Sequence, residues 1–517
     1  MGMGRALAVA LVGLNGHVIE VEADIGQTLP NFILLGLPDA SLSEARERIR
    51  SAAQNTGIPL SRRKITVNLV PASLPKRGSG FDLAIVMAAL NAAGDVRRTG
   101  GTVFLAELGL DGRLRSVRGV LPAVLAAYSA GHREFVVAAA NLGEAQLVSG
   151  AKVRAYDCLA QVVLDFDADP KDLTALDAGW DSGTVPAEAI QTTPDGQAGM
   201  DLAEVAGQPV ARLALEIAAA GGHHLMMVGP PGSGKTMLAE RLPGLLPDLN
   251  DVEAMEVTAI HSLEYRSNGL VSLMRRPPYE RPHHSASTAS IIGGGSGIPR
   301  PGAASRAHRG VLFLDEAPEF DKRVLDALRQ PLESGELVLH RSAGTAAYPA
   351  RFQLIMAANP CPCGKATGKG INCECTPMAR RRYFGRLSGP LLDRVDIQLQ
   401  VNKLQLSQLA STEPRESSAQ VAGRVLLARN IASERLKQWG LVHNADLSGR
   451  ILRGPLRLGG HHTALLDKAM GTGVLSARGY DRVLRLAWTV ADLQGLERPG
   501  SDDVGLALTL RQRGEGL

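Results

Sequence analysis

Aromatic residues and long apolar runs are both scarce in this sequence. Phe, Trp and Tyr make up 4% of the 517 residues, so surfaces on which bases could stack are few. No run of about 18 apolar residues occurs, and we therefore expect no membrane-spanning helix. Hydrophobic residues nevertheless amount to 45% and charged residues to 21%, which predicts a globular chain with sizeable cores.

Cysteine is also rare, and its distribution is uneven. Cys158 stands alone, whereas the other four cysteines lie within residues 361–375. Such crowding is typical of a metal site rather than of disulfide bonds, and it predicts a reducing, cytoplasmic location. The net charge of +4 is compatible with nucleic acid binding but does not indicate it, since a solvated mixed surface explains it better.

The N-terminal stretch MGMGRALAVALVGL faintly resembles a signal peptide, but HVIEVEADI follows it and alternates like a strand. Asn15-Gly16 lies between the two apolar runs and predicts a hairpin turn. We therefore interpret the N-terminus as a folded hairpin.

The chain divides into four parts by pattern. Residues 1–165 alternate strand-like and helix-like runs, and residues 166–200 are rich in Asp, Pro, Gly, Thr and Ser without a lasting period. Residues 201–402 again alternate strand-like and helix-like runs, whereas residues 403–517 are mostly helical in pattern. These patterns predict an α/β protein with a linker at 166–200.

An apolar run over residues 225–228 ends in a full phosphate-loop motif, GPPGSGKT. Its glycines let backbone N–H groups surround a triphosphate, and the helix-like pattern that follows would point its positive end at the phosphates. Lys235 would neutralise the β- and γ-phosphates of ATP, and Thr236 would offer a hydroxyl to Mg²⁺. The predicted nucleotide contacts are Gly229, Pro230, Pro231, Gly232, Ser233, Gly234, Lys235 and Thr236.

A second apolar run, residues 311–314, ends in Asp315-Glu316. Two carboxylates at the end of a buried strand are costly unless they have a role. Asp315 would hold Mg²⁺ through its water shell, and Glu316 would polarise the water that attacks the γ-phosphate. An exposed turn is the alternative, and the phosphate loop in the same chain argues against it.

A third apolar run ends at Asn359, within FQLIMAANP. Its amide could position the attacking water beside the γ-phosphate, or it could cap the turn before Pro360. The residues alone do not decide between these two interpretations.

Two arginines, Arg386 and Arg394, flank a helix-like piece in RLSGPLLDRVDIQL. An arginine that reaches a neighbouring γ-phosphate stabilises the charge that develops during transfer. Salt bridges of Arg394 with Asp393 or Asp396 are the alternative.

Taken together, these motifs make the chain resemble the Mg-chelatase-like AAA+ ATPases, and within them the YifB/ComM family of competence-associated DNA branch-migration helicases. The resemblance covers almost the whole chain. It implies an AAA+ core over residues 201–402 with a four-cysteine insertion, a helical lid over residues 403–517, and a hexameric ring that binds ATP between subunits and acts on DNA. The resemblance rests on DLAEVAGQ, LALEIAAAGGHHLMMVGPPGSGKTMLAERLPGLLP, RPHHSASTASIIGGG, AHRGVLFLDEAPEF, ALRQPLESGELVLHR, ANPCPCG and RLSGPLLDRVDI.

The resemblance also implies roles for three polar residues. It makes Asn359 the sensor on the third strand and Arg394 the finger supplied to a neighbouring subunit. Arg478, in LSARGYDR, matches the second sensor, with Arg485 as the alternative.

Residues 1–165 resemble the proteolytic domain of Lon, an α+β domain with a ribosomal protein S5-like fold, whose serine–lysine dyad cuts peptides. Here the nucleophile position falls on Gly80, Ser79 is one place early, and Leu121 stands where the lysine belongs. Because a nucleophile without a positioned base is inert, we expect no protease activity. A working pair of Ser79 with Lys76 is the alternative.

The clustered cysteines are Cys361, Cys363, Cys373 and Cys375, arranged as two C-x-C pairs. Four thiolates suit structural Zn²⁺, and an iron–sulfur cluster or reduced free thiols are the alternatives. Basic residues nearby could grip a phosphate backbone or form a solvated face, namely Lys365, Lys369, Arg380, Arg381 and Arg382.

Two further polar pairs stand in loops. His283 and His284 are expected to hydrogen bond near the nucleotide or at a subunit contact. His340 and Arg341 belong to a predicted hairpin that either touches DNA or is merely exposed.

Other functions share these features. A magnesium-chelatase-type ATPase subunit would use the same core, but the Lon-like domain and the cysteine insertion favour the YifB/ComM family. An ATP-dependent protease is opposed by Gly80 and Leu121. A remodelling factor would use ATP as a switch, whereas intact Lys235 and Glu316 indicate turnover.

Overall fold

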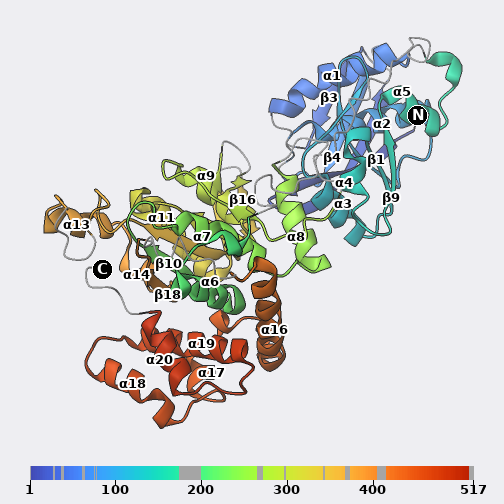
Figure 1. Cartoon of the computed structure of the whole chain (residues 1–517). Helices are drawn as coiled ribbons and strands as arrows, with labels where there is room; N and C mark the ends of the chain where they lie inside the picture. The colour runs from blue at the N-terminus through green and yellow to red at the C-terminus, as the bar shows by residue number, and fades with distance from the viewer. Residues whose placement is uncertain are drawn as a thin grey trace.

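The computed structural model describes residues 2–26, 29–36, 40–60, 64–74, 76, 78–173, 200–264, 272–295, 299–341, 344–366, 373–403 and 415–511. A seven-stranded sheet lies at one end of the molecule, a five-stranded sheet in the middle, and a group of C-terminal helices against the second sheet (Figure 1). The predicted α/β class is confirmed. Most of the predicted linker, residues 174–199, lies outside the described residues.

The first sheet is mixed, with strand order β3-β4-β2-β1-β5-β8-β9. Its strands are β1 (Gly4–Val12), β2 (Asn15–Gly26), β3 (Asn31–Leu35), β4 (Lys64–Val70), β5 (Thr102–Leu105), β8 (Glu134–Ala138) and β9 (Lys152–Tyr156), with a small ribbon of β6 (Glu107–Leu108) and β7 (Leu114–Arg115) beside it. The helices that cover it are α1 (Ala40–Thr56), α2 (Asp82–Ala93), α3 (Val120–Ser129), α4 (Leu142–Ala145) and α5 (Leu159–Asp165).

Alternation along β1 divides the helices of this part into two layers. Ala6, Ala8 and Ala10 pack with α1, α2 and α5 on one face, whereas Leu7 and Val9 pack with α3 and α4 on the other. Successive side chains of a strand point to opposite faces, so one short apolar run serves both layers. The helix α2 is apolar on nearly every side, and most of its residues are correspondingly buried.

The N-terminal hairpin is present, but the predicted turn at Asn15-Gly16 is wrong. Val12 pairs with Asn15, so the turn consists of Gly13 and Leu14, and Asn15 and Gly16 belong to β2. Gly13 has a φ of 68°, a left-handed conformation that glycine adopts without strain. The turn therefore forms at Gly13, two residues before the expected position.

The second sheet has five parallel strands in the order β11-β14-β17-β10-β18. The predicted strands at 225–228, 311–314 and before Asn359 are all present. Since the strands are parallel, their carboxyl ends meet at one edge of the sheet, and this edge carries the candidate site. The bounds are β10 (Leu225–Val228), β11 (Tyr279–Glu280), β14 (Val311–Leu314), β17 (Gln353–Ala358) and β18 (Ile397–Gln400).

Both faces of this sheet are covered, as all-parallel sheets require. Ile355 and Ala357 of β17 share a core with α6 and the C-terminal helices, whereas Leu354 and Met356 face α9 to α12. The helices of the middle part are α6 (Pro209–Gly221), α7 (Lys235–Arg241), α8 (Asp251–Ser262), α9 (Thr288–Ile292), α10 (Ala303–Arg306), α11 (Lys322–Ala327), α12 (Arg329–Ser334), α13 (Pro377–Phe384) and α14 (Gly389–Leu392). Two small ribbons accompany them, β12 (Gly293–Gly294) with β13 (Arg300–Pro301), and the hairpin of β15 (Glu336–Arg341) with β16 (Gly344–Pro349).

The C-terminal helices are α16 (Ser418–Leu436), α17 (Gly449–Arg453), α18 (Gly460–Gly471), α19 (Ala477–Gln494) and α20 (Ser501–Thr509). Ser417 and Ser476 cap α16 and α19 through side-chain hydrogen bonds, as serine does at helix starts. A buried polar network joins α19 to the strand end before β18, because His223 bonds both Asp396 (3.1 Å) and Thr489 (2.7 Å). No helix among the described residues combines the length and apolarity needed to cross a bilayer.

The helix α8 connects the two sheets (Figure 1). Ala259 packs in the core beneath α3, and the Gly119 N–H donates to the carbonyl of Ser262 at 3.1 Å. The Ser262 hydroxyl donates to Glu144, whose pKa is raised by burial. The helix therefore belongs to the middle part by sequence and docks on the first part by packing.

His261 on α8 predicts an acid-sensitive stability. Burial lowers its pKa to about 4, whereas an unfolded histidine titrates near about 6.5. Below about pH 6.5 the unfolded state binds a proton at this histidine, whereas the folded state binds one only below about pH 4. Between these two pH values the free energy of unfolding therefore falls by about 1.4 kcal/mol per pH unit. Between about pH 7.5 and about pH 5, a His261→Gln variant should lose about 2 kcal/mol less free energy of unfolding than the parent.

Chemical denaturation at the two pH values measures this difference. The control is His461→Gln, at an exposed histidine, which should lose as much stability as the parent. Equal losses in the parent and in His261→Gln would contradict a buried neutral His261.

Candidate nucleotide site and four-cysteine centre

The predicted phosphate loop borders a cavity of about 410 Å³ at the carboxyl edge of the five-stranded sheet. This volume lies within the range of small-molecule sites, which is roughly 300–1,000 Å³. Residues from the loop, from the end of β14 and from the end of β17 meet here, as the strand pattern predicts. The lining residues are Pro231, Gly232, Ser233, Gly234, Lys235, Thr236, Met237, Asp315, Glu316, Ala358 and Asn359.

Three glycines shape the loop for backbone reasons. A side chain at Gly229 would collide with the carbonyl oxygen of Val401, so the strand end can approach its neighbour only without a Cβ. Gly232 and Gly234 have φ values of 75° and 88°, in the left-handed region that favours glycine. A buried hydroxyl, that of Ser233, has no hydrogen-bond partner among the described residues, and it lies in the same loop.

Lys235 is 8% exposed and lies at the floor of the cavity. Its ammonium donates to the carbonyls of Gly229 (2.7 Å) and Pro230 (3.0 Å) and to Oδ1 of Asn359 (3.3 Å). Burial lowers the pKa of Lys235, and the carboxylates of Asp315 and Glu316 oppose that effect. An anion in the cavity would stabilise the charged ammonium, which burial destabilises by removing its hydration.

Asp315 links the loop to two neighbouring strands. The Thr236 hydroxyl donates to Asp315 Oδ2 at 3.0 Å, the pairing expected of two groups that share one hydrated cation. Arg281 donates to the same oxygen at 2.8 Å and to Glu240 at 2.8 Å. Sequence reasoning missed Arg281, since β11 has only two residues and leaves no apolar run to signal a strand end.

Glu316 adopts a left-handed backbone conformation, with φ of 52° and ψ of 44°. Such a conformation in a residue other than glycine stores strain and recurs at functional sites. His284 lies beside it, with Nδ1 at 3.5 Å from Glu316 Oε2, and the ring of His283 packs on His284. The two histidines therefore lie near the predicted nucleotide position, next to the residue expected to activate water.

Asn359 directly follows β17, and the N–H of Gly229 donates to the carbonyl of Ala358 at 3.1 Å. The amide oxygen of Asn359 faces Lys235, so this side chain lies in the site. Its predicted role toward water stays a prediction.

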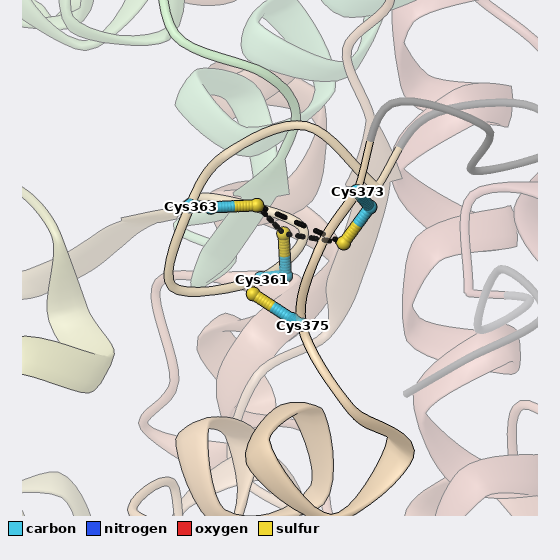
Figure 2. Close-up of side chains that lie close together, drawn as sticks. All are labelled: Cys361, Cys363, Cys373 and Cys375. Atoms are coloured by element: carbon cyan, nitrogen blue, oxygen red, sulfur yellow. Dashed lines mark hydrogen bonds between the residues drawn. The ribbon is translucent and has the colours of Figure 1, made fainter.

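The four cysteines come together beside the end of β17 (Figure 2). The sulfur of Cys361 lies 3.3 Å from that of Cys363 and 3.6 Å from that of Cys373, and all four sulfurs are within 4.8 Å of one another. Thiolates in a zinc tetrahedron, with Zn–S near 2.3 Å, are separated by about 3.8 Å. The geometry of these four residues thus fits a metal ion bound by four thiolates. We call Cys361, Cys363, Cys373 and Cys375 the four-cysteine centre.

Comparison with known proteins agrees with this arrangement. Models of the magnesium chelatase subunit ChlI match residues 201–409 and 21–141, and a model of its C-terminal region matches residues 415–511. The competence protein ComM of Haemophilus influenzae is 41% identical over 498 residues, which cover 96% of this chain and 94% of ComM. The chain belongs to the Mg-chelatase-like ComM/YifB family.

Two further relatives extend the likeness. The uncharacterized protein YifB of Escherichia coli is 40% identical over 94% of this chain and 92% of its own length. An uncharacterized protein of Mycobacterium tuberculosis is 49% identical over 99% of each chain. As a ComM/YifB family member the chain has an AAA+-type ATPase core, and the family indicates ATP and Mg²⁺ as its nucleotide and ion.

The two arginines that the ComM/YifB resemblance singles out lie elsewhere. Among the residues that the structure describes, neither Arg394 nor Arg478 lines the cavity. Arg394 pairs with Glu333 and donates to the carbonyl of Pro390, whereas Arg478 is exposed and lies 3.8 Å from Asp393. The expected alternative partners of Arg394, Asp393 and Asp396, are therefore not the ones it takes, and Glu333 was not anticipated.

The other arginines considered have structural partners. Arg386 donates to the carbonyl of Pro318 at 2.9 Å and pairs with Glu319 at 3.2 Å. Arg485, the alternative second sensor, donates to the carbonyl of Leu447 at 2.7 Å.

The residues of the suspected serine–lysine pair each have another partner. The Ser79 hydroxyl bonds to Glu107, and the buried ammonium of Lys76 donates to the carbonyls of Gly36 and Pro71. Leu121, a residue of α3, is fully buried in the core. Pro75 and Arg77, in the same stretch, lie outside the described residues.

The basic residues near the cysteines are only partly described. Arg380, Arg381 and Arg382 lie on α13, whereas Lys369 falls outside the described residues. His340 is exposed on β15 and bonds Thr345 across the hairpin at 3.0 Å.

Proposed function

We propose that this chain is an ATP-driven motor that acts on DNA and moves branched junctions during recombination. The observation that carries the motor is the meeting of Lys235, Thr236, Asp315, Glu316 and Asn359 around one cavity. The DNA substrate is supported by 41% identity, over nearly the whole chain, to a protein named for competence.

The cavity supports hydrolysis as follows. The phosphates of ATP would lie over the backbone N–H groups of residues 229–236, with Lys235 beside the β- and γ-phosphates. Thr236 and Asp315, already 3.0 Å apart, would hold Mg²⁺, which neutralises charge on the phosphates. Glu316 would take the proton of the attacking water, and Asn359 would orient that water.

Arg394 and Arg478 would act on a neighbouring subunit. Both lie outside the cavity of their own chain. They belong to one face, because Arg478 lies 3.8 Å from Asp393, the residue that precedes Arg394. A homo-oligomeric ring, hexameric by family resemblance, would bring this face to the next cavity. Arg394 would then stabilise the charge on the γ-phosphate, and Arg478 would act as the second sensor.

The remaining parts take supporting roles in this proposal. We assign residues 1–165 to an inactive Lon-like domain, 166–200 to a linker, 201–402 to the AAA+ core and 403–517 to the helical lid. The hydrogen bonds of Ser79 and Lys76 support the absence of protease activity, because Ser79 bonds to Glu107 and Lys76 to backbone carbonyls. The four-cysteine centre would hold Zn²⁺, in keeping with a cytoplasmic location.

A second candidate is a magnesium-chelatase-type ATPase subunit, or more broadly an ATP-dependent remodelling factor. The match of all three parts to models of chelatase subunit ChlI favours it. The match to the competence protein ComM, 41% identical over 96% of this chain, favours the DNA motor.

ATP hydrolysis measured against a series of nucleic acids tests the proposal. We expect four-way and forked DNA to raise kcat severalfold, single-stranded DNA to raise it less, and a porphyrin to have no effect. The mass measured in the presence of ATP should be that of a ring-forming oligomer, six chains by family resemblance. Hydrolysis that no DNA stimulates would contradict the DNA substrate and favour the second candidate.

A further inference from the structure

The four-cysteine centre contacts the phosphate loop through the residue that follows Cys363. Gly364 directly follows Cys363 and packs on Pro231 of the loop, so closely that a Cβ on Gly364 would lie 2.7 Å from Cγ and Cδ of that proline. The N–H of Gly364 donates to the carbonyl of Cys361 at 2.9 Å. The turn that carries two of the thiols is therefore in contact with the residue that begins the bend around the phosphates.

The other pair of thiols is connected to a second side of the site. Cys375 directly precedes Thr376, which caps α13 through a hydrogen bond to the N–H of Ala379. Near the end of α13, Tyr383 is buried. Burial raises the pKa of its hydroxyl and the neighbouring backbone of Asn359 opposes that rise, so the end of α13 lies beside Asn359. The helix also contacts the turn at residues 317–319, which follows Glu316.

A metal ion would join these two supports. Cys361 and Cys363 belong to the segment after β17, and Cys373 and Cys375 belong to the segment that leads into α13 (Figure 2). Four thiolates at these separations repel one another. A divalent cation bound by all four neutralises much of their charge and holds them together. With the ion bound, the contacts at Pro231 and at Asn359 are held by one rigid unit; without it, they depend on loop packing alone.

The strands of the core do not depend on the centre. Leu225–Val228 and Gln353–Ala358 are buried residue by residue. In the four-cysteine centre Cys361 is buried, whereas Cys363 is exposed and the other two cysteines are partly exposed. Loss of the ion should therefore change the site before it changes the fold.

We propose that a Zn²⁺ ion bound by the four-cysteine centre holds the phosphate loop and Asn359 in the geometry needed for ATP turnover. The inference rests on the proposed ATPase function. The ion takes no part in the reaction, and its loss lowers turnover without unfolding the five-stranded sheet.

Two variants separate the metal from the contact that it supports. Cys363→Ser with Cys375→Ser removes one ligand from each segment. Gly364→Ala keeps all four thiols but disturbs the contact, because it places a methyl group against Pro231 at a φ of 72° that disfavours alanine. Cys158→Ser, at the cysteine of the first part, is the matched control. The measurements are zinc content by elemental analysis, binding of a fluorescent ATP analogue, steady-state ATP hydrolysis without DNA, and thermal unfolding.

The parent and Cys158→Ser should contain one zinc ion per chain and hydrolyse ATP equally. The double cysteine variant should lose the zinc and at least tenfold in kcat/KM, with the main unfolding transition in place. Gly364→Ala should retain the zinc and lose kcat/KM in the same direction. A zinc-free chain that binds and hydrolyses ATP like the parent, or a parent purified without zinc under reducing conditions, would overturn the inference, whereas a parent that hydrolyses no ATP would contradict the proposed function itself.

Discussion

Replacing Glu316 by glutamine is expected to leave ATP binding intact and to lower kcat by roughly 10²- to 10⁴-fold, the usual contribution of a general base. Glutamine has the size of glutamate and can still accept a hydrogen bond from water, but it cannot take the proton. Lys235, Thr236 and the loop backbone are unchanged, so the phosphates keep their contacts.

Equilibrium binding of a fluorescent ATP analogue and single-turnover hydrolysis measure the two halves of this expectation. Glu319→Gln is the matched control, because Glu319 lies three residues on, outside the residues that line the cavity, and pairs with Arg386. We expect it to retain most of the parent rate. The Glu316→Gln chain should also fail to move four-way junctions; parent-like migration by this variant would remove Glu316 from the mechanism.

Replacing Arg394 by alanine is expected to lower kcat by about 10³-fold, the low end of what an arginine finger contributes. The variant keeps every residue that lines its own cavity, so ATP binding to the isolated chain should change little. The loss arises because each ring site lacks the positive charge that its neighbour would supply.

Mixing two inactive chains tests whether the arginine acts between subunits. A Lys235→Ala chain has a defective cavity but an intact Arg394, and an Arg394→Ala chain has the reverse. Where the first adjoins the cavity of the second, one complete site forms, so mixed rings should regain hydrolysis that neither chain shows alone. If the mixed rings regain no activity, Arg394 acts on the cavity of its own chain. If the mixture regains activity with Arg386→Ala in place of Arg394→Ala, the finger is Arg386.

The candidate site could be predicted from sequence because each of its residues follows an apolar strand. Lys235 closes a glycine loop after residues 225–228, and Asp315 and Asn359 come directly after two further runs. Parallel strands bring such ends together, so a one-dimensional pattern was enough. Arg281 escaped this logic, since its strand is only two residues long.

Other features depend on packing between segments far apart in sequence. Glu333 and Arg394 are distant in the chain, and nothing in either stretch signals that they pair. The contact of Gly364 with Pro231 likewise arises from the fold of the segment after β17 over the loop. The hairpin turn shows a local limit, because Asn15-Gly16 and Gly13 are competing turn signals and the sequence alone did not rank them.

The docking of α8 has a mechanical consequence. Residues 242–250, which include a 3-10 helix at Leu242–Leu245, join the end of α7 to α8. The first residue of α7 is Lys235, and α8 contributes Ala259 to the core beneath α3. A tilt of α7 as nucleotide enters or leaves would therefore move α8, and with it the seven-stranded sheet on which α8 docks. The seven-stranded sheet would then follow the nucleotide state of the cavity, which gives the first part a role that needs no peptide cleavage.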